Sequence, residues 1–142
     1  MMDLWAFHPR SSTLRQLSSV PWPKNVNKNN GAKKKSNNNK NPAPCVGEGA
    51  AVASYGNDLF VCGGYESDLM FRYHSELDSW SECAPMKRAR QHFAMATVGD
   101  AVYVIGGVTS GGTEPLASVD KYDIGRNRWS TAGSLLWGVS FI

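Results

Sequence analysis

The sequence contains few of the side chains on which metal centres and thiol chemistry depend. Its 142 residues include three cysteines and three histidines, and no two cysteines have Cys-x-x-Cys spacing. The histidines are scattered, so we expect no metal site, no cofactor and no catalytic thiol. No stretch is long and apolar enough to cross a membrane, and the N-terminus lacks the basic start and apolar core of a secretory signal. These absences predict a cytoplasmic or nuclear protein with no membrane partner.

Acidic residues are absent from residues 24–41, which contain six Lys and eight Asn. Such a composition cannot bury enough apolar surface to fold, so residues 24–44 are predicted to be a disordered Lys/Asn-rich insertion. The whole chain has a formal charge of +3, and removing these six lysines leaves −3 for the remainder. Because a nucleic-acid-binding surface needs basic residues on structured elements, we expect no nucleic-acid partner. A localisation signal at residues 33–35 is an alternative, but a solvated low-complexity run is the simpler interpretation.

One pattern of turn, apolar run and Gly-Gly pair occurs twice. Residues 57–64 and 100–107 align without a gap at an offset of 43. Each copy has a turn residue, a short run rich in β-branched and aromatic side chains, and a final glycine pair. The alignment extends to the small and apolar residues that precede each turn. Each copy is therefore predicted to contain two successive strands joined by a tight turn, the second of them buried.

Each copy continues with an aromatic pair at the same spacing. Tyr73 and Trp80 are seven residues apart, as are Tyr122 and Trp129, and a turn segment lies inside each pair. Two further strands in a hairpin are therefore predicted. The offset between the aromatic pairs is 49 rather than 43, so six additional residues lie in the loop around residues 109–115. Strands that keep their register while loops on one side vary in length are typical of a repeat protein.

This four-stranded unit, with Gly-Gly after the second strand and Tyr-x6-Trp across the third and fourth, resembles the kelch motif of β-propellers. The resemblance implies an all-β fold: a kelch-type β-propeller fragment of about two and a half four-stranded blades from a six-bladed ring. Phe7 and Leu14 occupy the Tyr and Trp positions of a first, partial unit, whereas His74 departs from the family's Tyr-Asp, which the second unit keeps at Asp123. The expected segments are the third and fourth strands of a preceding blade (1–23), the Lys/Asn-rich insertion (24–44), two blades (45–86 and 87–135), and either a divergent tail or the start of a further blade (136–142).

The repeated residues are expected to be structural rather than ligand-binding. A glycine pair lets the backbone turn sharply and pass close to a neighbouring blade, where a Cβ would obstruct it. Tyr and Trp are large enough to fill the wedge between blades, and their O–H and N–H groups need partners there. This structural kelch motif consists of Gly63, Gly64, Tyr73, Trp80, Gly106, Gly107, Tyr122 and Trp129.

The segment from Trp80 to Met86 resembles the BTB-kelch (kelch-like) substrate-adaptor family in particular. The resemblance implies a non-enzymatic protein-interaction module that captures a substrate, while BTB and BACK domains, absent from this sequence, recruit a Cullin-3 ubiquitin ligase. An actin-binding or other cytoskeletal kelch scaffold is the alternative. Some kelch propellers, such as galactose oxidase, are copper enzymes, but the Tyr, His and Cys set that they need does not occur here at repeating positions. No carboxylate pair has acid–base spacing either, so we expect no catalytic residue.

Partners of such propellers usually dock on the loops between the second and third strands and on the connections between blades. The run 87–90, Lys-Arg-Ala-Arg, is the densest charge on a structured part of the chain. An Arg pair there could hold an acidic peptide through bidentate contacts, and a solvated turn is the equal alternative. Packing at the start of a strand is the alternative for His92. The expected partner-binding residues are Tyr65, Glu66, Ser67, Lys87, Arg88, Arg90, Gln91, His92, Thr109, Ser110 and Glu114.

Overall fold

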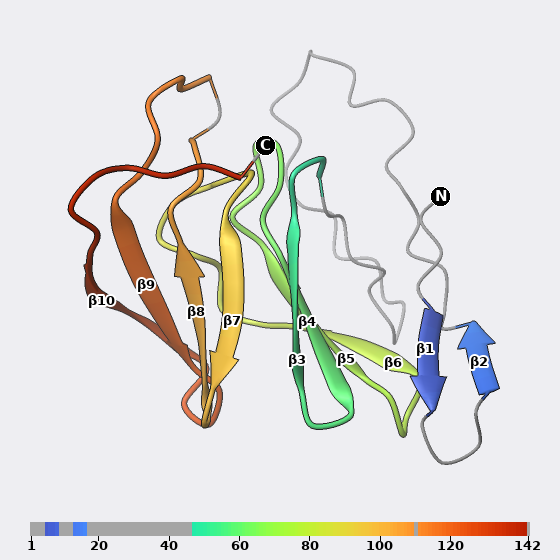
Figure 1. Cartoon of the computed structure of the whole chain (residues 1–142). Helices are drawn as coiled ribbons and strands as arrows, with labels where there is room; N and C mark the ends of the chain where they lie inside the picture. The colour runs from blue at the N-terminus through green and yellow to red at the C-terminus, as the bar shows by residue number, and fades with distance from the viewer. Residues whose placement is uncertain (1–4, 9–12, 17–46, 110, 142) are drawn as a thin grey trace, which may run out of the picture.

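The computed structural model describes residues 5–8, 13–16, 47–109 and 111–141 (Figure 1). The predicted insertion at 24–44 and Ser110 lie outside these residues. No helix that could cross a membrane occurs in the described part of the chain. The strands there are β1 (Trp5–His8), β2 (Thr13–Gln16), β3 (Ala51–Tyr55), β4 (Asp58–Cys62), β5 (Met70–His74), β6 (Ser79–Glu82), β7 (Ala94–Val98), β8 (Ala101–Ile105), β9 (Ser118–Asp123) and β10 (Arg128–Ser134).

Eight of these strands form two four-stranded antiparallel sheets. The first blade has the order β3-β4-β5-β6, and the second has the order β7-β8-β9-β10. The aromatic residues spaced seven apart face each other across the outer hairpins, as Tyr73 and Trp80 do. In the separate β1–β2 hairpin, Phe7 pairs with Leu14, as Tyr73 pairs with Trp80 in the first blade. The all-β class and the four-stranded unit are confirmed, while the assignment of residues 1–23 to a preceding blade stays a prediction.

Glycine begins the turn between the first two strands of each blade. Gly56 and Gly99 have φ values of +57° and +58°, and each starts a two-residue connection between paired strands. Two-residue hairpins favour a positive φ at this position because their twist then matches that of the strands, and glycine adopts it without a steric penalty. These two turns fix the register of the inner hairpins and hence which strand residues face the neighbouring blade.

The core lies between the two blades, where the inner strands β3 and β7 are neighbours. Phe60 and Cys62 of the first blade are fully buried against Val102 and Tyr122 of the second. The rings of Phe60 and Tyr122 meet edge to face, with centroids 5.9 Å apart. Cys62 therefore behaves as a small hydrophobic residue, as its alignment with an isoleucine in the second copy predicted.

Trp129 and Tyr122 hold the segment that joins the two blades. The indole Nε1–H of Trp129 donates to the carbonyl of Ala84 at 2.8 Å, and the backbone N–H of Ala84 donates to Asn127 Oδ1 at 2.7 Å. The same Asn127 oxygen accepts a hydrogen bond from the Tyr122 hydroxyl at 2.7 Å. Both aromatic side chains thus have partners for their polar ends, as aromatic residues in an interior wedge require.

The second glycine of each Gly-Gly pair marks a close approach of two backbones. Gly64 and Gly107 have φ values of +100° and +86°. A Cβ on Gly64 would lie 2.5 Å from the carbonyl oxygen of Gly47, and one on Gly107 would lie 2.6 Å from that of Gln91. Contacts this short with backbone atoms cannot be relieved by a side-chain rotation, so only glycine fits at these positions.

The tail of the chain crosses the second blade along the path that the inter-blade connector takes across the first. The backbone N–H of Gly64 donates to the carbonyl of Arg90 at 3.0 Å, and that of its counterpart Gly107 donates to the carbonyl of Val139 at 2.7 Å. Val139 therefore has in the tail the position that Arg90 has in the connector. Of the two alternatives for residues 136–142, the repeated path favours the start of a further blade, and that assignment stays a prediction.

A carboxylate caps the turn between the third and fourth strands of each blade. In the second blade Asp123 accepts a hydrogen bond from the backbone N–H of Arg126 at 2.9 Å. In the first blade His74 stands at the equivalent position, and the carboxylate comes instead from Asp58 at the start of β4, which accepts from the Ser75 N–H at 3.1 Å. The departure from the Tyr-Asp pattern is therefore compensated by a neighbouring strand.

These two caps should make the fold sensitive to acid. Burial raises the pKa of Asp58, but hydrogen bonds from Arg72 and the Ser75 N–H, with the nearby positive charges, outweigh it and leave this pKa below its usual value. Hydrogen bonds from the Arg126 N–H and guanidinium lower the pKa of Asp123. A carboxylate with a lowered folded-state pKa stabilises the fold above its unfolded-state pKa of about 3.9, and the contribution is lost as the pH falls through the folded-state pKa.

The expected result is a smaller loss of stability on acidification in Asp58→Asn than in the parent chain. The quantity to measure is the urea midpoint at about pH 5 and about pH 3, because the Asn side chain cannot be protonated over this range. Glu114→Gln, which alters an exposed residue far from these turns, is the control. An Asp58→Asn profile parallel to that of the parent would show that this cap does not contribute to the acid response.

Candidate functional site

The described segments that contain the predicted partner-binding residues lie at one end of the two blades, the upper end in Figure 1, and Ser110 lies outside the described residues. The structure brings their segments together through backbone hydrogen bonds. Gln91 and Val108 exchange two bonds of 2.9 Å, and the carbonyl of Arg90 accepts from the N–H of Gly64 at 3.0 Å. We call this surface the rim, and it consists of residues 65–68 between β4 and β5, residues 87–92 between the blades, and residues 109 and 111–114 between β8 and β9.

Exposure divides the rim residues into two groups. Tyr65 is 54% exposed and is the aromatic residue of the predicted set that partners can contact. The other exposed residues of the predicted set are Glu66, Lys87, Arg88 and Glu114. The half-buried ones are Ser67, Gln91, His92 and Thr109. The exposed group therefore contains the side chains that are most accessible to a partner.

Two of the half-buried residues form hydrogen bonds within the protein. The Ser67 hydroxyl accepts a hydrogen bond from the backbone N–H of Leu69 at 3.3 Å within the same loop. The backbone N–H of His92 donates to the carbonyl of Gly49 at 2.9 Å, and His92 has a φ of +53°, a left-handed conformation that non-glycine residues adopt rarely. Both residues shape the surface of the rim more than they extend from it.

Arg90 is a correction to the sequence analysis, because its side chain lies in the interior. The side chain is 0% exposed, and its Nη2 lies 2.6 Å from Oδ2 of Asp120. Nη1 donates to the carbonyl of Gly106 at 2.9 Å, and Ser118 provides two weaker contacts at 3.4 and 3.2 Å. A guanidinium enclosed by these acceptors has no free side for a partner, so the prediction that Arg90 contacts an acidic peptide is wrong.

Asp120 is the residue that sequence reasoning missed. It lies in β9 and is 3% exposed. The repeat aligns it with Phe71, which is 4% exposed, and it aligns Arg90 with Gly47. The second blade therefore has a charged residue at each of two positions where the first blade has an uncharged one. A charge aligned with a buried phenylalanine was the available signal for an interior ion pair.

With Arg90 in the interior, the rim has no excess of positive charge. Lys87 and Arg88 are its remaining basic residues, and the ammonium group of Lys87 donates to the Thr131 hydroxyl at 2.7 Å. The carboxylates in the same segments are Glu66, Asp68 and Glu114. Arg88 is therefore the basic rim residue that is best placed to contact an acidic group of a partner.

The two thiols among the described residues are both shielded from solvent to some degree. Burial raises the pKa of the Cys62 thiol strongly and raises that of the half-buried Cys83 as well, so neither is readily deprotonated at neutral pH. No group of three or more His, Cys, Asp or Glu side chains that could hold a metal ion occurs in this part of the chain.

Comparison with known families identifies the repeat. The kelch motif model matches residues 48–87 and 89–136, which together make up more than half of the chain. The chain belongs to the kelch motif family. The two matched stretches contain the two four-stranded sheets, one in each.

Several kelch-like proteins are relatives of this kelch chain. Human Kelch-like protein 34 is 36% identical over 110 residues, which cover 66% of this chain and 17% of that protein. Human Kelch-like protein 23 is 32% identical over 98 residues, covering 65% of this chain and 17% of that protein. The resemblance to the kelch-like family is confirmed, and the chain spans 17% of the length of these two curated relatives.

A solved structure agrees with the fold. The structure of YjhT matches with a TM-score of 0.61 and 20% sequence identity, covering 70% of this chain and 31% of that one. At this level of identity the likeness concerns the fold alone. Together with the family match and the two sheets, it confirms the predicted class, an all-β kelch-type propeller fragment.

Proposed function

We propose that this kelch module binds a protein partner through its rim. The observation that carries the proposal is that loop segments from both blades are joined by backbone hydrogen bonds into one surface. Tyr65 is 54% exposed on that surface. An exposed tyrosine presents a large contact area with little conformational entropy to lose, which is typical of the anchor residues of protein interfaces.

We further infer that this chain acts as the substrate-capturing part of an adaptor of a Cullin-3 ubiquitin ligase in the cytoplasm or nucleus. The support is the similarity to Kelch-like proteins 34 and 23. In such an adaptor the propeller captures the substrate, while BTB and BACK domains recruit Cullin-3. Those domains are not among these 142 residues, so the part assigned to this chain is substrate capture.

The position of Arg90 changes the partner that we propose for the rim. An acidic peptide held by a pair of arginines would require Arg88 and Arg90 to face the same partner, and Arg90 is fully buried. We propose instead a mixed contact, in which Tyr65 packs against the partner and Arg88 pairs with a single acidic side chain. An exposed pair of this kind directs association and orientation more than it adds affinity.

Tyr65→Ala and Arg88→Glu should each weaken partner capture, whereas Arg128→Glu should not. Arg128 is exposed at the start of β10, at the opposite end of the blades, so it provides the same charge change away from the rim. The measurement is affinity purification of the tagged chain with quantitative mass spectrometry, and we expect capture to fall about tenfold for Tyr65→Ala, the effect of removing an interface anchor.

The same purification distinguishes the possible roles. An equal loss of capture in Arg128→Glu would show that the rim is not the contact surface. Recovery of Cullin-3 subunits, which requires BTB and BACK domains from a full-length partner or parent chain, would support the adaptor role. Recovery of actin without them would replace that role by a cytoskeletal scaffold.

A further inference from the structure

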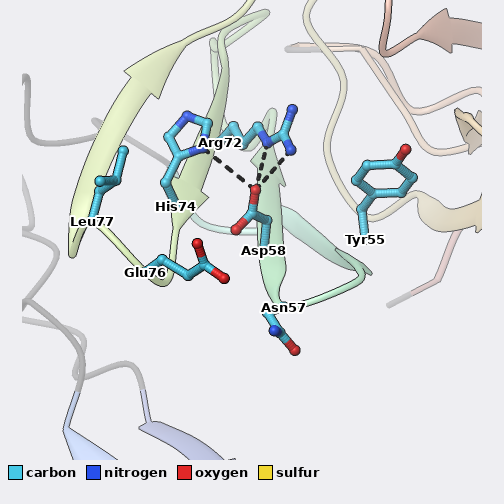
Figure 2. Close-up of a pocket in the computed structure, with 7 residues that line it drawn as sticks. All are labelled: Tyr55, Asn57, Asp58, Arg72, His74, Glu76 and Leu77. Carbon is cyan, nitrogen blue, oxygen red and sulfur yellow. Dashed lines mark hydrogen bonds and ion pairs between the residues drawn. The ribbon is translucent and has the colours of Figure 1, made fainter.

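A groove lies at the end of the blades opposite the rim, where the two-residue hairpin turns are. It consists of two cavities with volumes of about 290 and 690 Å³, which share Tyr55 and Arg72 in their walls. The smaller cavity lies along the turns of the first blade (Figure 2). The larger one reaches the turn of the second blade at residues 123–126. We call the two together the turn-side groove.

Arg72 stands between the cavities, and its charge is already matched. Its Nε and Nη2 lie 2.9 and 2.7 Å from Oδ2 of Asp58. Figure 2 marks both interactions with dashed lines. The guanidinium carbon lies 5.5 Å from the ring centre of Tyr55 and 5.4 Å from that of Phe60. The ion pair and the two ring contacts hold this side chain in place. Arg72 therefore shapes the groove without making it positive.

The lining as a whole is negative. Its charged groups are four carboxylates and two guanidinium groups, namely Asp58, Glu76, Asp100, Asp123, Arg72 and Arg126. Each guanidinium pairs with one carboxylate, Arg72 with Asp58 and Arg126 with Asp123. Within the described part of the chain, Glu76 and Asp100 have no ion-pair partner. With His74 neutral, the groove carries a net charge of −2.

Each unmatched carboxylate shares a cavity wall with an apolar residue. Leu77 follows Glu76 in the chain, lines the smaller cavity with it and is 74% exposed, and Ile124 lines the larger cavity together with Asp100. The Tyr55 hydroxyl donates to the Asp100 carboxylate at 2.8 Å and so orients it. Lysine and arginine side chains have an apolar stem and a charged end, and they bind best where an apolar surface leads to a carboxylate.

We propose that the turn-side groove binds a basic segment of a protein partner, with one Lys or Arg side chain in each cavity. The charged ends pair with Glu76 and Asp100, and the stems pack on Leu77 and Ile124. An anionic segment is disfavoured by the net negative charge of the lining. Because the rim and this groove lie at opposite ends of the blades, the module can hold two protein partners at the same time.

The test is the binding of a fluorescently labelled oligolysine peptide to the full chain, measured by anisotropy at physiological ionic strength. The double variant Glu76→Gln/Asp100→Asn should weaken binding about three- to tenfold, because it removes two exposed ion pairs. The control Glu48→Gln/Glu82→Gln removes the same charge from exposed residues outside both the rim and the groove. Its effect should stay within about twofold, because salt screens charges at that distance.

Three outcomes would overturn the proposal: no loss of affinity in the groove variant, an equal loss in the control variant, or equally tight binding of an oligoglutamate peptide. The titration is repeated with the six lysines of residues 24–41 changed to Gln. A gain in affinity that disappears again in the groove variant would support the turn-side groove as the site for cationic side chains and identify this segment as a competitor for it. A gain that persists in the groove variant would count against the groove.

Discussion

Asp120→Leu is expected to lower the free energy of unfolding by about 3 to 5 kcal/mol, because it leaves the guanidinium of Arg90 buried without a counter-charge. Arg90 is 0% exposed, and Asp120 is its only ion-pair partner among the described residues. Burial lowers the pKa of Arg90, and the neighbouring carboxylate opposes this effect. The hydrogen bonds to Gly106 and Ser118 remain in the variant, but they do not neutralise the charge. Chemical denaturation followed by circular dichroism measures the loss.

The double variant Arg90→Met/Asp120→Leu should recover most of that stability. Replacing both members of a buried ion pair by apolar residues of similar volume is often neutral or stabilising, because neither charge then has to be desolvated. The first blade already does without the pair, since it has Gly47 and Phe71 at these positions. In addition, Nε of Arg90 has no hydrogen-bond partner in the described structure, so the native pair is itself incompletely satisfied.

Arg88→Met is the matched control for these two variants, since Arg88 is exposed two residues away. Its effect should stay within about 0.5 kcal/mol, as for most surface substitutions. A loss in Asp120→Leu no larger than that in Arg88→Met would contradict the interior position of the pair. A double variant as unstable as Asp120→Leu alone would show that packing, not charge, determines the loss.

The strands and the blades were predictable because the features that produce them are local and repeated. Each inner hairpin has a turn residue at the same place, an apolar run of the same length and a Gly-Gly pair after it. Two such copies in register restrict the fold far more than either copy alone. The aromatic pairs then place the outer strands, and in both blades they face each other in the structure.

The burial of Arg90 was not predictable in the same way, because it depends on a residue thirty positions away. In the sequence, Arg90 belongs to a basic run that is typical of a solvated turn. Only the folded second blade brings Asp120 of β9 next to the connector. Aligning the copies would have revealed an aspartate where the first blade has a buried phenylalanine, but the alignment does not say which cation matches it.

The turn-side groove was even less predictable from the sequence than the burial of Arg90. His74 stood out as a departure from the repeat, but its consequence depends on the register between β4 and β5. Leu59 pairs with Tyr73, which places Asp58 beside His74, and their side chains come within 3.4 Å. That carboxylate takes over the turn cap and also holds Arg72. Asp58, Arg72 and His74 therefore form an interacting group from two strands, which no local sequence pattern predicts.

Trp129→Ala is expected to lower the free energy of unfolding by about 3 kcal/mol, the lower end of the usual effect of removing a large aromatic side chain, because Trp129 is partly buried against the core. The indole packs on Tyr122 with ring centroids 5.2 Å apart, and its N–H donates to the carbonyl of Ala84. The variant removes the ring from the cluster between the blades and leaves that carbonyl without its donor. Arg88→Ala should change stability by no more than about 0.5 kcal/mol. The opposite ranking in chemical denaturation would contradict the role of Trp129 between the blades.

Trp129→Phe separates the ring from its hydrogen bond, because phenylalanine keeps most of the packing and has no N–H. We expect it to cost about 1 to 2 kcal/mol, of which the lost bond to the Ala84 carbonyl is a large part. Ala84 lies three residues before Lys87, where the connector enters the rim, so a looser connector should also displace Arg88. Trp129→Phe should therefore reduce partner capture through the rim while leaving oligolysine binding at the turn-side groove unchanged. A parallel loss at both surfaces would instead indicate that the second blade as a whole is destabilised.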